Sequence, residues 1–355
     1  MKILKYLFFL ILIIVIGGAI YFGTKESKYD IKDTYSINAP IDLIYNKVND
    51  FKEWEHWGPW KKSDSTIVFN YAEKTVGEGG SYSWTGEMDG SMKTTKVVEN
   101  KEIFQDLSLL TPGGERNPKV YWSFEEENGA TKVTWGMTGE HTLMDKVFYA
   151  FSGMDFEGDM HKMNLDGLKG IETSVLDDMK QFTVDVTGIS DYGGGYYLYL
   201  TASSKTSELS LKMGSMFGEI MGFVQQNNLQ TAGMPFTIYN QVSEANGTVI
   251  FSAAIPVKEN IITPEGSNVL CGFQEPTSAV KTILKGNYTN LGEAYEKAKT
   301  YIKDQHLIVD TSKDMFEIYA NDPGLVSNPA EWTTEVYIPV FKDLRSNNHP
   351  IISQQ

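Results

Sequence analysis

The hydrophobic and polar positions of this chain divide it into an apolar N-terminal run and two longer regions with globular patterns. The run covers the 17 residues 6–22, and only Gly17 and Gly18 interrupt it. This length is the short limit for an α-helix that spans a bilayer. A cleaved signal sequence would have a shorter apolar core and a clear small-residue cleavage site, which this stretch lacks. We therefore expect residues 1–23 to be an uncleaved, single-pass transmembrane anchor.

Lysines flank this run on both sides, with Lys2 and Lys5 before it and Lys25 and Lys28 after it. Because the two sides are balanced, the positive-inside rule does not set the orientation. The free amino terminus and the large distal part favour an N-inside anchor. We expect the soluble part to lie outside the cytoplasm, in the periplasm.

Residues 24–180 predict an antiparallel sheet held against a long helix. Residues 29–37 alternate as a strand does, and Asn38 and Pro40 suit the start of a following helix. About six short strands, separated by turns rich in Gly, Pro and Asn, come next. Residues 155–179 then place apolar side chains at three- and four-residue steps, as in a helix. This order is typical of a curved sheet that grips its last helix around a cavity.

Residues 181–343 contain a repeat of about 80 residues. Segments 213–217, 236–239 and 255–257 return as 291–295, 316–319 and 338–340. Two copies are too few for a repeat array, so we expect one domain with pseudo-two-fold symmetry and a groove between its halves. Each half is predicted as strand, helix, strand and strand, beginning at residues 182–187 in the first copy. The fold class is α+β, and residues 344–355 form a C-terminal tail.

Composition and charge narrow the function. The chain has 355 residues, of which 41% are hydrophobic, and this is enough for two ordinary domains with their own cores. Its net charge of −15 argues against a nucleic-acid partner. Cys271 is the only cysteine, and the five histidines lack ligand spacing, so we expect no metal site. The glycines at 193–195 lack the pattern of a phosphate loop, so no cofactor is expected.

The first globular region resembles the SRPBCC superfamily of START-type and polyketide cyclase-like helix-grip proteins. The resemblance rests on residues 35–40, 49–54, 57–60 and 165–172. It implies a binder of lipids or other hydrophobic ligands, a cyclase, or a module without a ligand.

Aromatic residues of this region are the candidates for lining a helix-grip cavity, because ligand pockets are rich in such side chains. They are Trp54, Trp57, Trp60 and Trp84. The alternative, which the sequence leaves open, is that they form ordinary core.

The second region resembles the gyrase-inhibitor-like (GyrI-like) domain, also called the AraC effector-binding or bacterial transcription activator domain. The matching motifs are 233–239, 284–288 followed by 294–295, and 321–323 leading to 331–340. The resemblance implies a groove that takes small, often aromatic and cationic molecules. It also implies that Glu335 is the acidic residue of the groove and that Tyr288 contributes to it.

Alternation in residues 333–340 agrees with that role. Val336 and Ile338 share one strand face, which would pack on helices, and Glu335 and Tyr337 share the other, towards the groove. A desolvated organic cation is attracted by aromatic walls and neutralised by a carboxylate. Further candidates at the groove are Tyr239 and Trp332.

These expectations combine into a membrane-anchored binding protein for small hydrophobic or amphipathic, and in part cationic, ligands. The partners would be a small molecule and the membrane, without nucleic acid, and the oligomeric state is left open. One alternative is a hydrolase of a reactive small molecule with Glu335 as general base. The other is a scaffold without a ligand.

Overall fold

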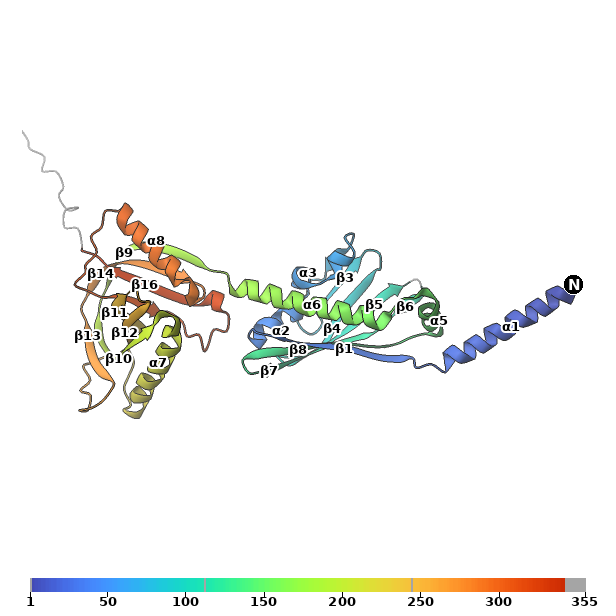
Figure 1. Cartoon of the computed structure of the whole chain (residues 1–355), viewed down its shortest axis with the longest axis horizontal. Coiled ribbons are helices and arrows are strands. Elements are labelled where there is room, and N and C mark those ends of the chain that lie inside the picture. Colours follow the sequence, from blue (N-terminus) through green and yellow to red (C-terminus); the bar gives the residue numbers. More distant parts are fainter. Residues whose placement is uncertain (1, 112, 244, 342–355) are drawn as a thin grey trace, which may run out of the picture. The chain divides into compact units, whose positions relative to one another are not determined.

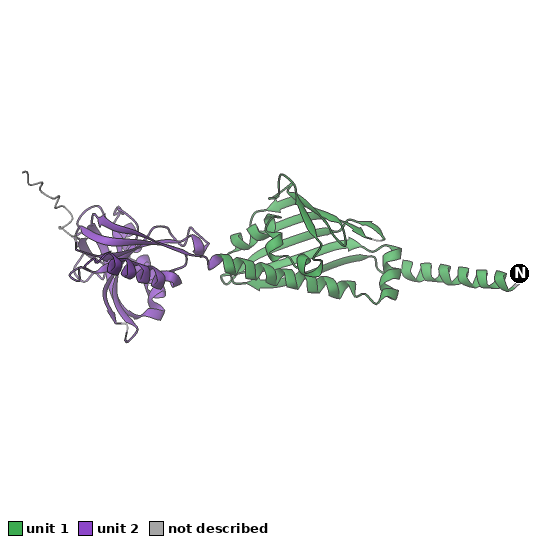
Figure 2. Cartoon of the chain, turned by 90° about the horizontal axis from the view of Figure 1, so that it is seen from above, with its two compact units in different colours: residues 1–178 green, residues 179–355 purple. Residues whose placement is uncertain are grey.

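The computed structural model describes residues 2–111, 113–243 and 245–341, so the expected tail at 344–355 lies outside the described residues. The chain divides into two compact units, Met1–Asp178 and Met179–Gln355 (Figures 1 and 2). Each unit contains one large antiparallel sheet, which gives the mixed α and β composition that the sequence predicts.

Helix α1 (Lys2–Gly23) begins unit 1. Its apolar side chains are exposed along its length, including Ile3, Ile13 and Ile20. The 21 residues Ile3–Gly23 are long and apolar enough to cross a membrane, as judged by length and composition.

The sheet of unit 1 has the strand order β1-β8-β7-β5-β4-β3-β2, with β6 paired to β5. Its strands are β1 (Lys28–Ile37), β2 (Val68–Tyr71), β3 (Ser81–Thr85), β4 (Gly90–Val98), β5 (Glu102–Thr111), β6 (Gly114–Arg116), β7 (Lys119–Glu127) and β8 (Ala130–Glu140). The helices after α1 are α2 (Ile41–Asn49), α3 (Trp54–Trp57), α4 (Trp60–Ser63), α5 (Leu143–Ser152) and α6 (Phe156–Met179). The strand expected at residues 29–37 is present as β1, and the helix expected at residues 155–179 is present as α6. Helix α5 and the three-residue strand β6 were not predicted from the sequence.

Helix α6 lies on the inner face of this sheet through Leu168, Ile171 and Val175, all of which are buried. Gly167 permits the close approach, since a Cβ atom there would lie 2.5 Å from the ring of Trp135. The strands present buried side chains at alternate positions to the same interior, as the period of two requires.

The sheet of unit 2 has the order β13-β10-β12-β11-β15-β16-β14-β9. Its strands are β9 (Thr183–Tyr192), β10 (Gly195–Lys205), β11 (Phe236–Ser243), β12 (Thr248–Pro256), β13 (Leu270–Gln274), β14 (Thr277–Lys285), β15 (Met315–Tyr319) and β16 (Thr333–Pro339). Two long helices, α7 (Leu209–Gln226) and α8 (Leu291–Asp304), are accompanied by the short turns η1 (Thr206–Glu208), η2 (Tyr288–Asn290) and η3 (Pro329–Glu331).

The repeat is visible in this topology. The unit β10-α7-β11-β12 corresponds to β14-α8-β15-β16, and the two copies meet where β11 pairs with β15. The expected first strand at 182–187 is therefore wrong as part of the repeat. It belongs to β9, an additional strand that pairs with β14 at the sheet edge. The side chains of β9 alternate in the same way as those of β10, which is the first strand of the repeat and follows the glycines at 193–195. The alternation alone therefore does not distinguish the two strands.

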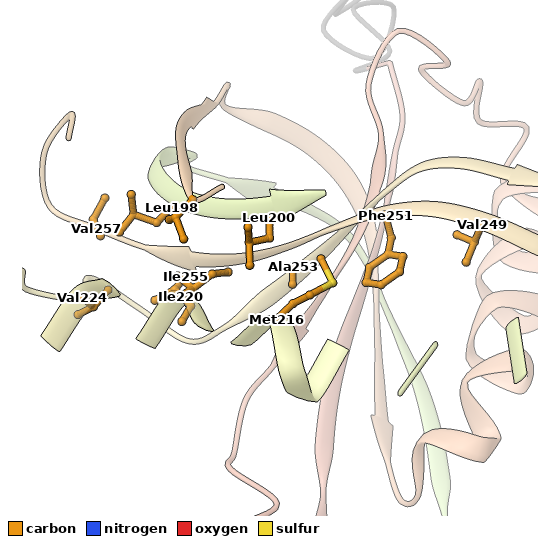
Figure 3. Close-up of a cluster of buried hydrophobic side chains, with 11 residues drawn as sticks. Leu198, Leu200, Met216, Ile220, Val224, Val249, Phe251, Ala253, Ile255 and Val257 are labelled. Carbon is orange, nitrogen blue, oxygen red and sulfur yellow. The ribbon is translucent and has the colours of Figure 1, made fainter. Parts of the chain in front are cut away.

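Helices α7 and α8 pack on the same face of the sheet, one on each half. Met216, Ile220 and Val224 of α7 join Leu198 and Phe251 of the strands in one buried cluster (Figure 3). Helix α8 packs in the same way on β14 and β16. The opposite face carries its own aromatic cluster, whose members include Tyr197, Phe236, Phe316 and Tyr337.

Candidate functional site

The centre of the pseudo-two-fold in unit 2 holds a carboxylate on the helix-covered face. Thr237 of β11 and Glu317 of β15 are direct partners across the central strand pair. They occupy equivalent positions of the two copies. Only 1% of Glu317 is exposed, and Thr237 is fully buried. The same strand position therefore carries a hydroxyl in one half and a buried acid in the other.

Tyrosine hydroxyls surround this acid. Tyr295 of α8 donates to Glu317 Oε1 at 2.7 Å, and Tyr319 donates to Oε2 at 3.1 Å. The hydroxyl of Tyr239 is a further hydrogen-bonding neighbour of the carboxyl group. Tyr239 and Tyr319 are equivalent residues of the two copies, so the repeat itself builds this ring.

The electrostatics of Glu317 follow from its burial. Desolvation raises the pKa of the carboxyl group, and the hydroxyls of Tyr295, Tyr239 and Tyr319 act in the opposite direction. Within the described part of the chain, no lysine, arginine or histidine contributes to the shift. Burial and the neighbouring Glu317 also hold the pKa of Tyr295 well above its ordinary value. The site is a buried acid with neutral partners.

Helix α7 supplies apolar and polarizable groups beside the tyrosines. Met213 Sδ lies 2.9 Å from Thr237 Oγ1 and 3.3 Å from the hydroxyl of Tyr319. The ring of Phe217 lies 5.9 Å from that of Tyr319, edge to face. Phe217 is the counterpart of Tyr295 in the repeat, so α7 offers an apolar ring where α8 offers a hydroxyl.

Two further candidates from the sequence extend this cluster towards the surface. The ring of Tyr288 lies 5.5 Å from that of Tyr319 and 4.8 Å from that of Trp332. Burial raises the pKa of Tyr288 to about 12. Tyr239, Tyr288 and Trp332 thus belong to one aromatic region around Glu317.

The other two candidates, Glu335 and Tyr337, lie on the opposite face of the sheet, as the alternation in β16 predicts. Tyr337 donates to Glu335 Oε2 at 2.7 Å, and Lys281 Nζ lies 2.8 Å from Glu335 Oε1. The same ammonium lies 5.6 Å from the centre of the Tyr337 ring. Glu335 therefore already has a cation, and the sheet separates it from Glu317.

A groove of about 520 Å3 opens on this second face. Its lining includes Tyr197, Tyr199 and Ser252. Neither Glu317 nor Glu335 is among the residues that line this groove.

Comparison with protein families agrees with these two architectures. Residues 38–156 match the model described as activator of Hsp90 ATPase homolog 1-like protein (AHSA1), an SRPBCC-type domain. Residues 196–340 match the GyrI-like small molecule binding domain. The chain carries an AHSA1-like domain followed by a GyrI-like domain. No curated protein matches the chain.

Solved structures show weaker likeness. The EcmrR–DNA complex shares 16% identity over 57% of this chain and 78% of that chain, with a TM-score of 0.39. The EcmrR C-terminal domain shares 18% sequence identity over 45% of this chain and 98% of that chain, with a TM-score of 0.36. The Aha1 dimer of Colwellia psychrerythraea shares 14% sequence identity over 41% of this chain and 96% of that chain, with a TM-score of 0.31. The expected exclusion of nucleic acid rests on the net charge alone and stays a prediction.

The tryptophans of the AHSA1-like domain pack against one another. Trp54 and Trp57 are 1% and 3% exposed, and Trp60 stacks on Trp54 at 5.3 Å between ring centres. Trp122 and Trp135 stack at 4.4 Å between ring centres and complete the cluster. These rings fill the interior between the sheet and α6.

Trp84 lies at the margin of this cluster, 5.2 Å from the ring of Tyr82, and its indole N–H donates to the Met88 carbonyl. A groove of about 1180 Å3 lies instead between α6 and the segment of α3 and α4. Charged residues such as Lys62, Lys169 and Asp166 line it. The space beside α6 is therefore polar, whereas a hydrophobic ligand would need an apolar cavity.

Glu317 is a functional candidate that the sequence analysis did not nominate, although its signal was present. The repeat aligns residues 236–239 with 316–319, and threonine at 237 becomes glutamate at 317. The later pair of Ser252 and Glu335 shows the same kind of change, and Glu335 was nominated instead. Period-two alternation would have placed Glu317 on the helix-packed face, where an acid requires a functional or structural reason.

Proposed function

We propose that this chain is a membrane-anchored binding protein whose GyrI-like domain takes a small lipophilic cation at Glu317. The observation that carries the proposal is the enclosed carboxyl group of Glu317, whose described partners are tyrosine hydroxyls. The description of the matching family as a small molecule binding domain supports the same role.

A buried carboxylate is unfavourable when ionised unless a cation compensates it. The raised pKa of Glu317 means that a proton supplies this compensation more readily in the free protein. An organic cation entering the site would replace the proton and restore the ionised form. The faces of Tyr239, Tyr295 and Tyr319 would add cation–π attraction, which is strongest at desolvated sites.

Glu335 has less support as the acid of the site. Lys281 already neutralises it and covers Tyr337, so a ligand cation would have to displace an internal ammonium. The hydrolase alternative faces the same obstacle, because a general base must be free to accept a proton from water. Glu335 already has a lysine as its ion-pair partner, whereas the partners of Glu317 are hydroxyl groups. Glu317 is therefore the better candidate for binding a ligand cation.

The membrane part of the proposal rests on α1, whose apolar surface is exposed along the helix. The proposal also places the part of the chain that follows α1 in the periplasm, as expected from the sequence. An anchored binding protein of this kind would capture amphipathic molecules close to the bilayer in which they accumulate.

The test is the affinity of the full-length protein in nanodiscs for tetraphenylphosphonium, with isosteric tetraphenylborate as the charge-reversed probe. Glu317→Gln removes an interaction with a charged group, worth about 1.5–3 kcal/mol, so we expect affinity for the cation to fall roughly ten- to a hundredfold. The anion should bind weakly to the wild type and no more weakly to the variant.

The matched control is Glu335→Gln, the same substitution on the neighbouring strand but on the opposite sheet face. We expect it to leave cation affinity nearly unchanged. The reverse pattern, with loss in Glu335→Gln and retention in Glu317→Gln, would move the site to the other face and overturn the assignment. Circular dichroism of each variant separates loss of binding from loss of fold.

A further inference from the structure

Helix α5 (Leu143–Ser152) has its apolar side outward. None of its ten residues is buried, and Phe151, Met144 and Phe148 are 81%, 69% and 55% exposed. Residues three and four apart lie on one side of a helix, so these three side chains form a single stripe. A surface helix of a globular domain normally turns such a stripe towards the core.

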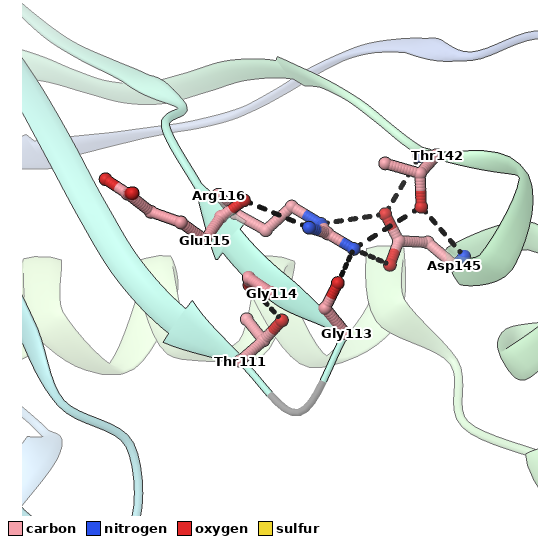
Figure 4. A network of polar contacts seen from close by, with 7 residues as sticks. All are labelled: Thr111, Gly113, Gly114, Glu115, Arg116, Thr142 and Asp145. Carbon is pink, nitrogen blue, oxygen red and sulfur yellow. Dashed lines mark hydrogen bonds and ion pairs between the residues drawn. The ribbon is translucent and has the colours of Figure 1, made fainter.

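Polar contacts fix this inverted orientation (Figure 4). Arg116 donates from Nη2 to Asp145 Oδ1 at 2.7 Å and from Nε to Oδ2 at 3.0 Å. Thr142 caps the helix, and its side chain and that of Asp145 form a reciprocal capping box. Tyr149 packs inward on Phe156, at 5.3 Å between ring centres. The domain therefore grips the polar side of α5 and leaves the apolar stripe free.

The stripe lies beside the end of α1. Lys146 of α5 donates to the Phe22 carbonyl at 3.2 Å and also to the Lys25 carbonyl. The ring of Phe151 lies 6.3 Å from that of Phe22. The exposed apolar surface of α1 thus continues onto α5.

We propose that α5 is an interfacial helix whose stripe of Met144, Phe148 and Phe151 inserts into the lipid surface around α1. The proposal rests on the membrane anchoring included in the proposed function. Interfacial helices bury their apolar face at the boundary between headgroups and acyl chains. Lipid is the occupant that fits, because it must surround the last turns of α1 if that helix crosses a bilayer. The chain's net charge of −15 makes apolar insertion, rather than attraction to anionic lipid, the source of binding.

Insertion is measurable by depth-dependent quenching in full-length protein reconstituted into phosphatidylcholine vesicles. Cys271→Ser removes the only native thiol, and Phe151→Cys then carries an environment-sensitive NBD fluorophore. Phe151 is exposed, so the substitution leaves the buried core unchanged and removes only the ring contact with Phe22. We expect blue-shifted NBD emission and strong loss of intensity with doxyl-labelled lipid.

Two control positions calibrate the measurement. Ile13→Cys reports on α1 itself. Glu126→Cys lies on β7 near the Ile37 end of β1, roughly 30 Å along the strand from the Lys28 end, and should stay unquenched.

Each remaining pattern overturns the proposal in a distinguishable way. Quenching of the label at position 13, with emission typical of water at position 151, would show that α1 lies in the bilayer but that α5 does not insert. Absence of quenching at both positions would reject the anchoring on which the proposal rests. Blue-shifted emission at 151 without quenching by lipid, together with disulfide formation between unlabelled Phe151→Cys chains under oxidising conditions, would identify a second copy as the occupant.

Discussion

At the residue scale, two glutamates on neighbouring strands show how environment decides the role of a side chain. Glu317 faces the helices, is almost fully buried and contacts hydroxyls. Glu335 faces the other side, is partly exposed and pairs with Lys281. Only the first requires an external cation, or a proton, to satisfy its burial.

The raised pKa of Glu317 makes a prediction about stability. Below its ordinary value of 4.5, the carboxyl is protonated in both the folded and the unfolded chain, and no penalty arises. As pH rises from there through the raised folded pKa, the unfolded chain releases the proton first, so stability is progressively lost. Each tenfold difference in proton affinity between the folded and the unfolded chain corresponds to a loss of about 1.4 kcal/mol.

Glu317→Gln should therefore unfold at higher urea concentration than the wild type at pH above the folded pKa, and at similar concentration in acid. The measurement is urea unfolding of the full-length protein across pH, with Glu335→Gln as the control that shows no such pH-dependent gain. A Glu317→Gln variant that is less stable than the wild type at all pH values would show that the ionised carboxylate supports the fold.

At the element scale, the two equivalent helices differ in their glycine content. Helix α7 contains Gly214, Gly218 and Gly222, and a Cβ atom at each would meet open space. The repeat replaces the last two by Glu296 and Thr300 in α8. Interior glycines weaken a helix by about 1 kcal/mol each relative to alanine. Since Met213 and Phe217 of this same helix cover the Glu317 cluster, we interpret α7 as the element that opens to admit a ligand.

Replacing Gly218 and Gly222 by alanine should then slow the association of tetraphenylphosphonium and raise stability by roughly 0.5–1 kcal/mol for each site. Stopped-flow fluorescence gives the rate. Gly292→Ala in α8, which also has open space, is the matched control and should leave association unchanged. Equal rates in the α7 variant and the wild type would exclude α7 as the gate.

The sequence predicts elements well where periodicity and burial agree. Helix α6 was predicted because Leu168, Ile171 and Val175 face the core in register with its period. Helix α5 was not predicted, because it is short and its apolar residues are exposed. Strand β9 was assigned to the repeat because an edge strand and a repeat strand share the same alternation, and only pairing distinguishes them.

At the scale of the whole molecule, the order of an apolar helix, an AHSA1-like domain and a GyrI-like domain was predictable from motifs and the repeat. The site at Glu317 is a proposal, and part of its cluster was nominated from the sequence. Tyr239, Tyr288 and Trp332 were nominated, but the acid they surround was not. The face that Glu317 occupies follows from the alternation in β15, but its place opposite Thr237 at the centre of the sheet depends on the pairing of β11 with β15. No local pattern encodes that long-range contact.

If a ligand cation replaces the proton on Glu317, binding must release that proton to the solvent. Calorimetric titration of the full-length protein with tetraphenylphosphonium, repeated in buffers of different ionisation enthalpy, counts the protons released. We expect release at pH values between the ordinary carboxyl value of 4.5 and the raised folded pKa of Glu317, in the wild type and in Glu335→Gln, and none in Glu317→Gln. Binding without proton release at any pH in that range, or equal release in Glu317→Gln, would show that the cation does not replace a proton on Glu317.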